Sequence, residues 1–224
     1  MWTYRIKYAK LGRIRFISHL DVMRAITRAI NRAKIPVAYS KGFNPRPKLS
    51  MGPPLPLGYE STCELADIAL VRMLRPEDLQ RSLGATMPRG LELLETTSVT
   101  PSSPRLSDAS SACYMIELAE GEMADNVGSL VRKFLMKDEA LVERVRRDKS
   151  SVLDARQFVK DVGVEAEADI QWLRAEISIG GQGTCSASQV AQAVLNLSPE
   201  RAKCLRIMRT DIRFDGRPLA GEKR

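Results

Sequence analysis

The chain has 224 residues, a formal net charge of +8 and 44% hydrophobic residues. This length fits one large domain or two of about 100 residues each, and the hydrophobic content suffices for a packed core, which excludes a disordered protein. No apolar stretch approaches the roughly 20 residues of a membrane-spanning helix, and the first residues hold no signal-peptide segment. We therefore expect a cytoplasmic protein that does not associate with a membrane.

The positive charge is concentrated near the amino terminus. The first 48 residues hold twelve Lys and Arg but one acid, Asp21, whereas residues 49–224 have a slight excess of acids. A one-sided positive field of this kind attracts a polyanion. RNA is the polyanion that we expect.

Cysteine spacing argues against a metal centre. Cys63, Cys113, Cys185 and Cys204 are far apart in the sequence, and the chain has one histidine. A zinc site or an iron–sulfur cluster usually requires closely spaced thiolates or imidazoles. We expect four reduced, mostly buried thiols, and neither a metal nor another cofactor.

Two stretches near the amino terminus predict strands. Residues 2–8 alternate between apolar and basic or polar side chains, which is typical of a half-buried strand with a basic outer face. Leu11 and Gly12 interrupt the pattern, and it resumes over residues 13–17. We therefore expect extended structure on both sides of this interruption.

Ser18 begins the first predicted helix, because the spacing from Ser18 to Asp21 is that of a helix N-cap and the helix dipole favours an anion at Asp21. Pro36 ends this helix. Arginines recur every four residues on the face that we expect to be exposed, and apolar residues form the buried stripe. The exposed residues are Arg24, Arg28 and Arg32, and the buried ones are Leu20, Met23, Ile26 (or Thr27) and Ile30.

The rest of the first hundred residues completes a βαββαβ order. Strands are predicted at 37–39, 62–70 and 90–99, and a helix at 76–83. A loop rich in Pro and Gly over residues 40–58 follows the second strand. Its prolines make it stiff, because each fixes φ and removes a backbone donor. Residues 1–100 thus predict a basic ferredoxin-like module.

Residues 101–110, with Pro101 and Pro104, predict a linker to a second module at 111–215. Its predicted elements are a strand at 112–119, a helix at 124–136, a hairpin at 141–156 turning at 147–150, a strand at 170–179, a helix at 186–196 and a strand at 203–214. An insertion at 157–165 interrupts this second pattern. The predicted fold class is α+β, with two ferredoxin-like modules in tandem, antiparallel sheets with helices on one face, and a frayed tail at 216–224.

Three segments of the first module carry a family resemblance. They are residues 13–24 (Arg-Ile-Arg-Phe-Ile-Ser-His-Leu-Asp-x-x-Arg), 39–48 (Tyr-Ser-Lys-Gly-Phe-Asn-Pro-Arg-Pro-Lys) and 55–61 (Leu-Pro-Leu-Gly-x-Glu-Ser). They resemble the signature of the bacterial radical-SAM-linked protein family, an uncharacterised domain often fused to, or encoded beside, a radical SAM protein. The resemblance implies a bacterial protein with a radical SAM partner, and it implies no activity. This chain lacks Cys-x-x-x-Cys-x-x-Cys, so the partner would carry out the chemistry.

Basic residues interleaved with aromatic ones mark the candidate RNA site. Cationic groups bind phosphates, and aromatic rings stack on the bases of single-stranded RNA. For the helix arginines the alternative is a merely solvated face, and for Phe43 it is packing of the ring onto the sheet. The residues that we expect to bind RNA are Arg13, Arg15, Arg24, Arg28, Arg32, Lys41, Phe43, Arg46 and Lys48.

His19 lies in the first turn of the predicted helix, where the helix dipole disfavours the protonated imidazole. A neutral His19 near Tyr39 and Lys41 is able to act as a general base in metal-independent RNA cleavage. The alternative, which we favour, is a structural histidine that hydrogen-bonds the neighbouring loop.

Two features remain open in the sequence. Periodicity does not decide whether Glu60, Glu64 and Asp67 of the third strand face the basic elements or water. The glycine-rich segment 180–183 precedes a predicted helix, but it lacks the Gly-Lys-Ser/Thr ending of a phosphate-binding loop, which favours a flexible turn.

These observations lead us to expect a non-enzymatic accessory protein that works with a radical SAM enzyme. It would bind RNA or present an RNA substrate to that enzyme. Its RNA would be a tRNA or a ribosomal RNA. The alternatives are a metal-independent endoribonuclease of ferredoxin-like fold, a protein-only adaptor for the radical SAM partner, and a site for a small anionic metabolite. The sequence does not identify the RNA, the oligomeric state or the role of the second module.

Overall fold

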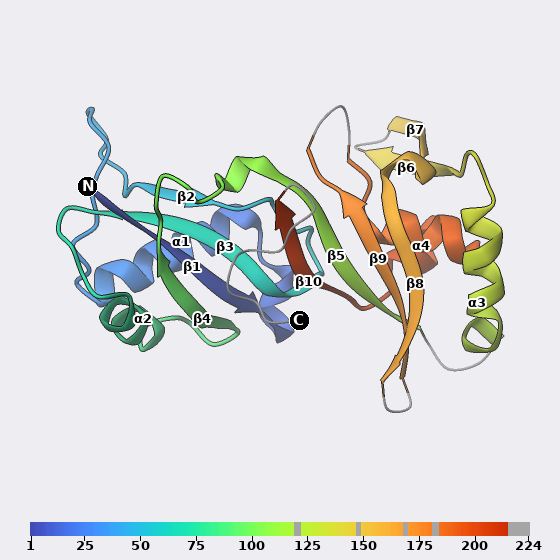
Figure 1. Cartoon of the computed structure of the whole chain (residues 1–224), viewed down its shortest axis with the longest axis horizontal. Helices are drawn as coiled ribbons and strands as arrows, with labels where there is room; N and C mark the ends of the chain where they lie inside the picture. The colour runs from blue at the N-terminus through green and yellow to red at the C-terminus, as the bar shows by residue number, and fades with distance from the viewer. Residues whose placement is uncertain (119–121, 147–148, 168–169, 181–183, 215–224) are drawn as a thin grey trace. The chain divides into compact units, whose positions relative to one another are not determined.

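The computed structural model describes residues 1–118, 122–146, 149–167, 170–180 and 184–214 (Figure 1). The chain divides into two compact units, unit 1 (Met1–Asp108) and unit 2 (Ala109–Arg224). Strand pairs within each unit are antiparallel and are accompanied by helices, so the predicted mixed α+β class is confirmed. The expected frayed tail lies outside the described residues.

Unit 1 follows the chain order strand, helix, strand, strand, helix, strand. Its strands lie in the order β4-β1-β3-β2 across the sheet. The elements are β1 (Trp2–Lys10), the 3-10 helix η1 (Gly12–Phe16), α1 (His19–Arg32), β2 (Leu49–Met51), β3 (Glu60–Leu70), α2 (Pro76–Gly84), β4 (Leu91–Ser98) and the 3-10 helix η2 (Leu106–Asp108).

The strand predicted at residues 13–17 is wrong, because most of this segment forms η1. Gly12 adopts a left-handed conformation with a φ of 68°, which turns the chain out of the strand direction. The ammonium group of Lys10 then donates hydrogen bonds to the carbonyl oxygens of Arg15 and Ile17, at 3.2 and 3.1 Å. These bonds hold the turn against the end of β1.

The second strand lies later than predicted. Residues 37–39 make only isolated bridges, from Val37 to Leu70 and from Tyr39 to Pro47. The strand that pairs with β3 is β2, inside the segment predicted to be loop. Edge pairing of so short a strand depends on the register with β3, which local sequence does not reveal.

Helix α1 begins as predicted, since the Ser18 hydroxyl accepts a hydrogen bond from the Asp21 amide at 3.2 Å. Its buried stripe differs from the prediction: Leu20 is 56% exposed and Met23 is only partly buried. Two alanines in the observed stripe allow α1 to approach the sheet closely, which moves the contact face away from Leu20. The buried residues are Val22, Ala25, Ile26, Ala29 and Ile30, and they pack in one core with Tyr4, Ile6 and Tyr8 of β1.

Unit 2 has a sheet in the order β10-β5-β9-β8. Helices α3 and α4 contact each other and strands of this sheet. The elements are β5 (Ala109–Leu118), α3 (Glu122–Leu135), β6 (Leu141–Arg146), β7 (Lys149–Asp154), the 3-10 helix η3 (Arg156–Phe158), β8 (Val159–Glu167), β9 (Ile170–Ser178), α4 (Ala187–Leu195), α5 (Pro199–Lys203) and β10 (Ile207–Phe214).

Two predictions for unit 2 need correction. The segment 157–165, predicted as an insertion, contributes most of β8, a strand of the main sheet. The predicted hairpin is confirmed, but β6 and β7 form a separate two-stranded sheet. The last strand begins at Ile207 rather than at 203, because Ser198 caps the short helix α5, with Pro199 at its first position.

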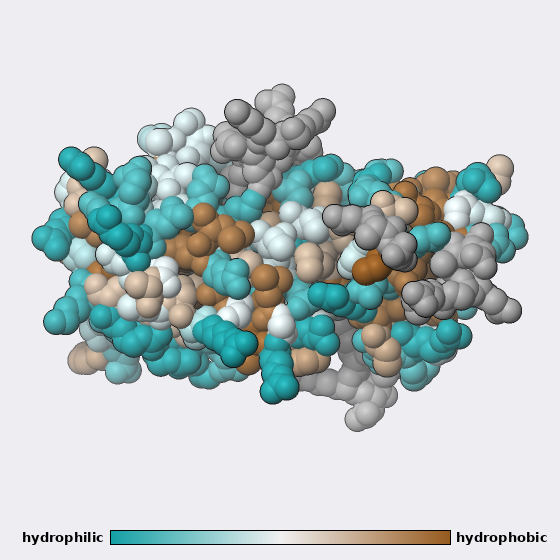
Figure 2. All heavy atoms as spheres, turned by 90° about the horizontal axis from the view of Figure 1, so that it is seen from below, coloured by the Kyte–Doolittle hydropathy of each residue, from teal (hydrophilic) through white to brown (hydrophobic). Residues whose placement is uncertain are grey.

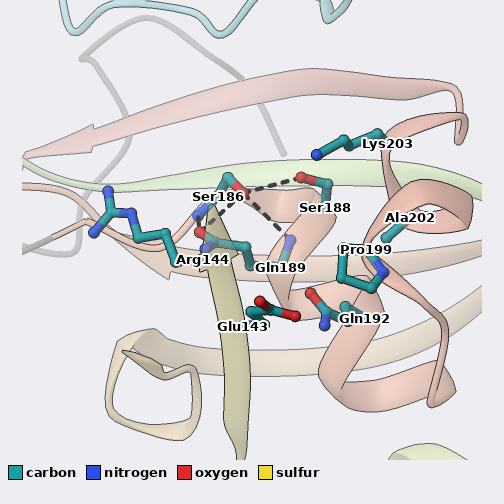
Figure 3. A pocket seen from close by; sticks show the side chains of 9 residues that line it. All are labelled: Glu143, Arg144, Ser186, Ser188, Gln189, Gln192, Pro199, Ala202 and Lys203. Carbon is teal, nitrogen blue, oxygen red and sulfur yellow. Dashed lines mark hydrogen bonds between the residues drawn. The ribbon is translucent and has the colours of Figure 1, made fainter. Parts of the chain in front are cut away.

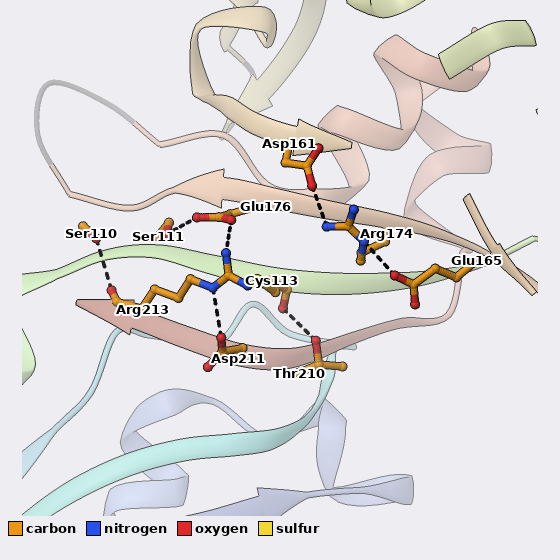
Figure 4. A network of polar contacts seen from close by, with 10 residues as sticks. All are labelled: Ser110, Ser111, Cys113, Asp161, Glu165, Arg174, Glu176, Thr210, Asp211 and Arg213. Carbon is orange, nitrogen blue, oxygen red and sulfur yellow. Dashed lines mark hydrogen bonds and ion pairs between the residues drawn. The ribbon is translucent and has the colours of Figure 1, made fainter. Parts of the chain in front are cut away.

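Ion pairs link strands of the unit 2 sheet (Figure 4). Arg213 of β10 pairs with the buried carboxylate of Glu176 in β9, which also accepts a hydrogen bond from the Ser111 hydroxyl at 2.7 Å. Arg174 of β9 makes two further pairs at 2.7 Å, with Asp161 and Glu165 of β8. Carboxylates within unit 2 thus neutralise these arginines.

The capping box of α4 yields the first testable prediction. The Ser186 hydroxyl accepts from the Gln189 amide at 3.3 Å, and the Gln189 side-chain oxygen accepts from the Ser186 amide at 3.0 Å. Ser186→Ala should therefore lower the free energy of unfolding by about 1 kcal/mol, measured by urea denaturation. Ser82→Ala, on the exposed side of α2, is the matched control and should change little. Equal effects of the two substitutions would contradict the role of the cap.

Candidate nucleic-acid interface

A braced loop connects α1 to β2 and projects from unit 1 (Figure 1). We call it the Phe43 loop, residues 38–48. Its two arms are joined by backbone hydrogen bonds from the Ser40 amide to the Arg46 carbonyl (2.8 Å) and from the Lys48 amide to the Ala38 carbonyl (2.7 Å). The Ser40 hydroxyl also accepts from the Arg46 amide at 3.0 Å. These bonds and the flanking prolines hold the tip in one arrangement.

The tip of the Phe43 loop presents an aromatic ring among cations. Phe43 is fully exposed, at 107% of its reference area, so the alternative that it packs onto the sheet is wrong. Lys41 and Arg46 are exposed as well, and neither makes an ion pair with any residue in the described part of the chain. Tyr39, at the base of the loop, is 47% exposed.

The three arginines of α1 are exposed, as predicted, but their environments differ. Arg24 pairs with Asp21 at 3.0 Å, and Arg32 donates a hydrogen bond to the carbonyl of Thr86. Arg28 has no such partner among the residues that the structure describes. Of the three guanidiniums, only that of Arg28 is therefore without a hydrogen-bond or ion-pair partner among the described residues.

Asp21 is held in its ionised form at the start of α1. Hydrogen bonds from the Ser18 hydroxyl and from the Arg24 guanidinium lower the pKa of this carboxyl from its ordinary value. The one acid of the amino-terminal segment thus serves the helix start and offsets Arg24.

Several cations of the amino-terminal segment form ion pairs with carboxylates of unit 1. Arg5, expected on a basic outer face, is 6% exposed and forms a two-pronged ion pair with Asp67 at 2.8 and 2.9 Å. Glu60 is buried, accepts from the Gly12 amide at 2.7 Å, and lies 4.0 Å from Arg15. Carboxylates of β3 thus face the basic elements, which resolves the orientation of Glu60 and Asp67.

Arg13 and Arg15 lie on η1, at the end of unit 1 where β1 finishes. Arg13 is exposed, whereas Arg15 is partly buried and its guanidinium carbon lies 4.8 Å from the centre of the Phe16 ring. Lys48 is exposed, at the other end of the sheet near Met1, whose sulfur lies 3.6 Å from the ammonium. The expected RNA-binding residues therefore occupy both ends of unit 1.

The structure does not bring His19 together with Tyr39 and Lys41. His19 begins α1 and Tyr39 follows its far end, and a helix of 14 residues is about 21 Å long. The strand register agrees, because Lys10 pairs with Ser61 near the start of α1, whereas Val37 bridges Leu70 at the opposite end of β3. A general base at His19 therefore cannot act jointly with the other two side chains.

Unit 2 contains a polar pocket of about 230 Å³ beside the start of α4 (Figure 3). Arg144 and Lys203 line it, together with Glu143 and Ser186. The capping box already occupies the Ser186 hydroxyl, and Arg144 donates to the Thr184 hydroxyl at 3.1 Å. Most of the glycine-rich segment 180–183 lies outside the described residues. The pocket is thus polar, and part of its hydrogen-bonding capacity is already used within unit 2.

The described residues contain neither a cluster typical of a metal site nor a helix that could span a membrane. Across the described ranges, no group of three or more His, Cys, Asp or Glu residues has the arrangement of a metal site. No helix in the same part of the chain is long and apolar enough to cross a membrane. On the face drawn in Figure 2, hydrophilic residues are interspersed with small hydrophobic areas. Three of the four cysteines are buried and Cys204 is exposed, and all four are free thiols.

These features define an α+β protein with a stiff loop that displays an aromatic ring and unpaired cations. The chain belongs to the family described as "Uncharacterized protein conserved in bacteria (DUF2344)", which matches residues 3–187. The comparison with curated proteins gave no match. Among solved structures, the crystal structure of an unknown protein from Galdieria sulphuraria is similar at 14% identity and a TM-score of 0.26, covering 92% of this chain and 95% of that one.

Sequence reasoning missed Arg89, in the turn before β4. The structure gives it an exposed position beside Arg13 on the wall of one hollow. Arg89 lies outside the basic amino-terminal segment, so the charge count did not single it out. The adjacent Gly90 was the available signal, since glycine before a predicted strand often marks a special backbone position.

Proposed function

We propose that this protein binds single-stranded RNA through unit 1 and presents it to a radical SAM enzyme. The observation that carries the proposal is the fully exposed Phe43 between Lys41 and Arg46 on a braced loop. A ring of this kind stacks on an unpaired base while the flanking cations neutralise the adjacent phosphates. A loop held in one arrangement loses little conformational entropy when it binds.

The charge of the amino-terminal segment supports assigning the RNA to unit 1, because the first 48 residues hold twelve Lys and Arg but one acid. Arginines on the sheet of unit 2 are paired with carboxylates, as Arg174 and Arg213 illustrate. In unit 1, Arg28, Lys41 and Arg46 have no acidic partner in the described chain. An unpaired cation contributes its full charge to phosphate binding, because no internal ion pair has to be broken first.

The radical SAM enzyme enters through the resemblance of residues 13–24, 39–48 and 55–61. Two of these segments contain functional candidates named above, Arg13 on η1 and the tip of the Phe43 loop. In this proposal the bacterial protein is a cytoplasmic accessory factor without its own chemistry, and tRNA or ribosomal RNA is its substrate. We also infer two ferredoxin-like modules, supported by the strand orders β4-β1-β3-β2 and β10-β5-β9-β8.

Substitution of Phe43 tests the proposal. Phe43→Ala should weaken binding of a fluorescein-labelled 15-nucleotide oligouridylate about tenfold, because loss of one base stack is worth about 1–3 kcal/mol. Phe43→Trp should retain the affinity, since it keeps a stacking surface. Met136→Ala, which removes an exposed apolar side chain from unit 2, is the matched control. Fluorescence anisotropy titrations measure all four proteins.

The outcome separates the proposal from its rivals. Equal affinities of the wild-type and Phe43→Ala proteins would remove the Phe43 loop from the RNA site. If this protein has no affinity for RNA, and a radical SAM protein still co-purifies with it after nuclease treatment, then this protein is a protein-only adaptor. The endoribonuclease has no comparable support, because His19 lies far from Tyr39, its proposed catalytic partner.

A further inference from the structure

Arg13 and Arg89 line one hollow of about 670 Å³, at the end of unit 1 where β1 finishes and β4 begins. Arg13 belongs to η1, and Arg89 precedes β4 by two residues. Both side chains are exposed. Neither makes an ion pair or a side-chain hydrogen bond within the ranges that the structure describes.

Gly90 holds together the two chain segments that carry the arginines. The Leu11 amide donates a hydrogen bond to the Gly90 carbonyl at 2.9 Å, which ties the two chain segments together. Gly90 has a φ of 90°, and a Cβ at this position would lie 2.9 Å from both the Leu11 carbonyl oxygen and the Cγ2 of Ile14. Only a residue without a side chain allows this approach. The hollow is thus built by backbone contact and not by flexible side chains alone.

The chemistry of the hollow suits a phosphate group. Two arginines from separate segments line one space, and a guanidinium offers a planar fork of donors that matches phosphate oxygens. Glu92 also lines the space, but it forms no ion pair with either arginine in the described structure. Two uncompensated cations at one hollow raise the local potential, and an anion between them lowers the electrostatic energy.

We infer that the Arg13–Arg89 hollow is a second phosphate site for the RNA strand that binds the Phe43 loop, an inference that rests on the function proposed above. The two sites lie at opposite ends of β1, since the base of the loop pairs near Leu70 and Leu70 pairs with Trp2, whereas Lys10 pairs with Leu91. Nine residues of strand span about 30 Å. A stacked strand that rises about 3.4 Å per nucleotide covers this span with about nine nucleotides.

RNA length is the variable that tests the inference. A labelled 4-nucleotide oligouridylate reaches only one site, whereas a 15-nucleotide oligouridylate reaches both. Arg13→Ala combined with Arg89→Ala should weaken binding of the 15-mer about 25-fold at 0.1 M salt and reduce its salt slope by about 1.4, the contribution of two phosphates in a single strand. Binding of the 4-mer, held at the Phe43 loop, should change less than twofold.

A charge-matched control and the Phe43→Ala protein complete the experiment. Arg81→Ala combined with Arg132→Ala removes the same charge from exposed helix positions and should leave both affinities within twofold. An unchanged 15-mer affinity in the Arg13/Arg89 variant would overturn the second site while leaving the Phe43 loop in place. An equal loss of affinity for the 4-mer and the 15-mer in the Arg13/Arg89 variant would also overturn the second site, because a strand too short to reach both sites would then depend on both. Wild-type protein that binds neither RNA would remove the proposed function itself.

Discussion

Replacing both Lys41 and Arg46 by glutamate should lower the affinity for single-stranded RNA by about a hundredfold at 0.1 M salt. Two phosphate contacts in a single strand account for about 25-fold of this loss through counterion release, and two carboxylates beside the strand add repulsion. The fold should be unaffected, because both side chains are exposed. The hydrogen bonds that brace the loop use the backbone of Arg46 and the hydroxyl of Ser40, which the substitutions retain.

Neutral substitutions separate lost contacts from added repulsion. Lys41→Gln with Arg46→Gln should reduce the slope of log K against log salt by about 1.4, without the further drop in affinity. Arg81→Glu with Arg132→Glu makes the same change in net charge at exposed helix positions outside the Phe43 loop and serves as the control. If that control weakened binding as strongly as the loop variant, the effect would come from the overall field of the protein, and the Phe43 loop would lose its special role.

Local signals in the sequence predicted the helices of unit 1 well. The Ser18 cap and the proline at 76 are short-range features, and both helix starts are found where these features lie. The exposed arginines of α1 followed from the helical period in the same way. Capping and periodicity act within a few residues, so one sequence suffices to read them.

Features that depend on partners distant in the sequence were missed. Arg5 was expected on a solvated face, but the register between β1 and β3 sets it opposite Asp67 and buries the pair. Lys10 was counted among the available cations, yet it is 2% exposed and supports the η1 turn. The first case follows from strand pairing and the second from the turn that begins at Gly12, and composition does not specify either.

At the candidate site too, some features could be predicted from the local sequence and others depend on the fold. The cations and the aromatic ring of the Phe43 loop were evident from composition, since Lys41, Phe43 and Arg46 lie within six residues. Their exposure was not evident, because a phenylalanine in a proline-rich loop packs inward as readily as outward. Arg89 could not be joined to Arg13 without the pairing of β1 with β4. Within the described residues, the internal ion pairs of unit 1 thus leave two groups of cations without an acidic partner, Lys41 with Arg46 and Arg13 with Arg89, at opposite ends of the sheet.

Gly90→Ala should lower the free energy of unfolding by about 2–4 kcal/mol, because two penalties combine at this position. An alanine at a φ of 90° is strained relative to glycine. Its Cβ would also meet the Leu11 carbonyl oxygen at 2.9 Å, and this contact is with backbone, which cannot rotate away. Relief of the clash requires the turn before β4 to move, and the 2.9 Å hydrogen bond from the Leu11 amide would weaken.

Gly12→Ala is the control that isolates the clash. Gly12 is also left-handed, with a φ of 68°, but a Cβ there meets nothing within 4 Å. Its substitution should therefore cost only the conformational penalty of about 1 kcal/mol, and the hydrogen bond from the backbone amide at position 12 to the Glu60 carboxylate should persist. Urea denaturation of the three proteins measures the difference. Equal losses of unfolding free energy at the two glycines would mean that η1 and the turn before β4 are not held in close contact. The placement of Arg13 and Arg89 at one hollow would then have no basis.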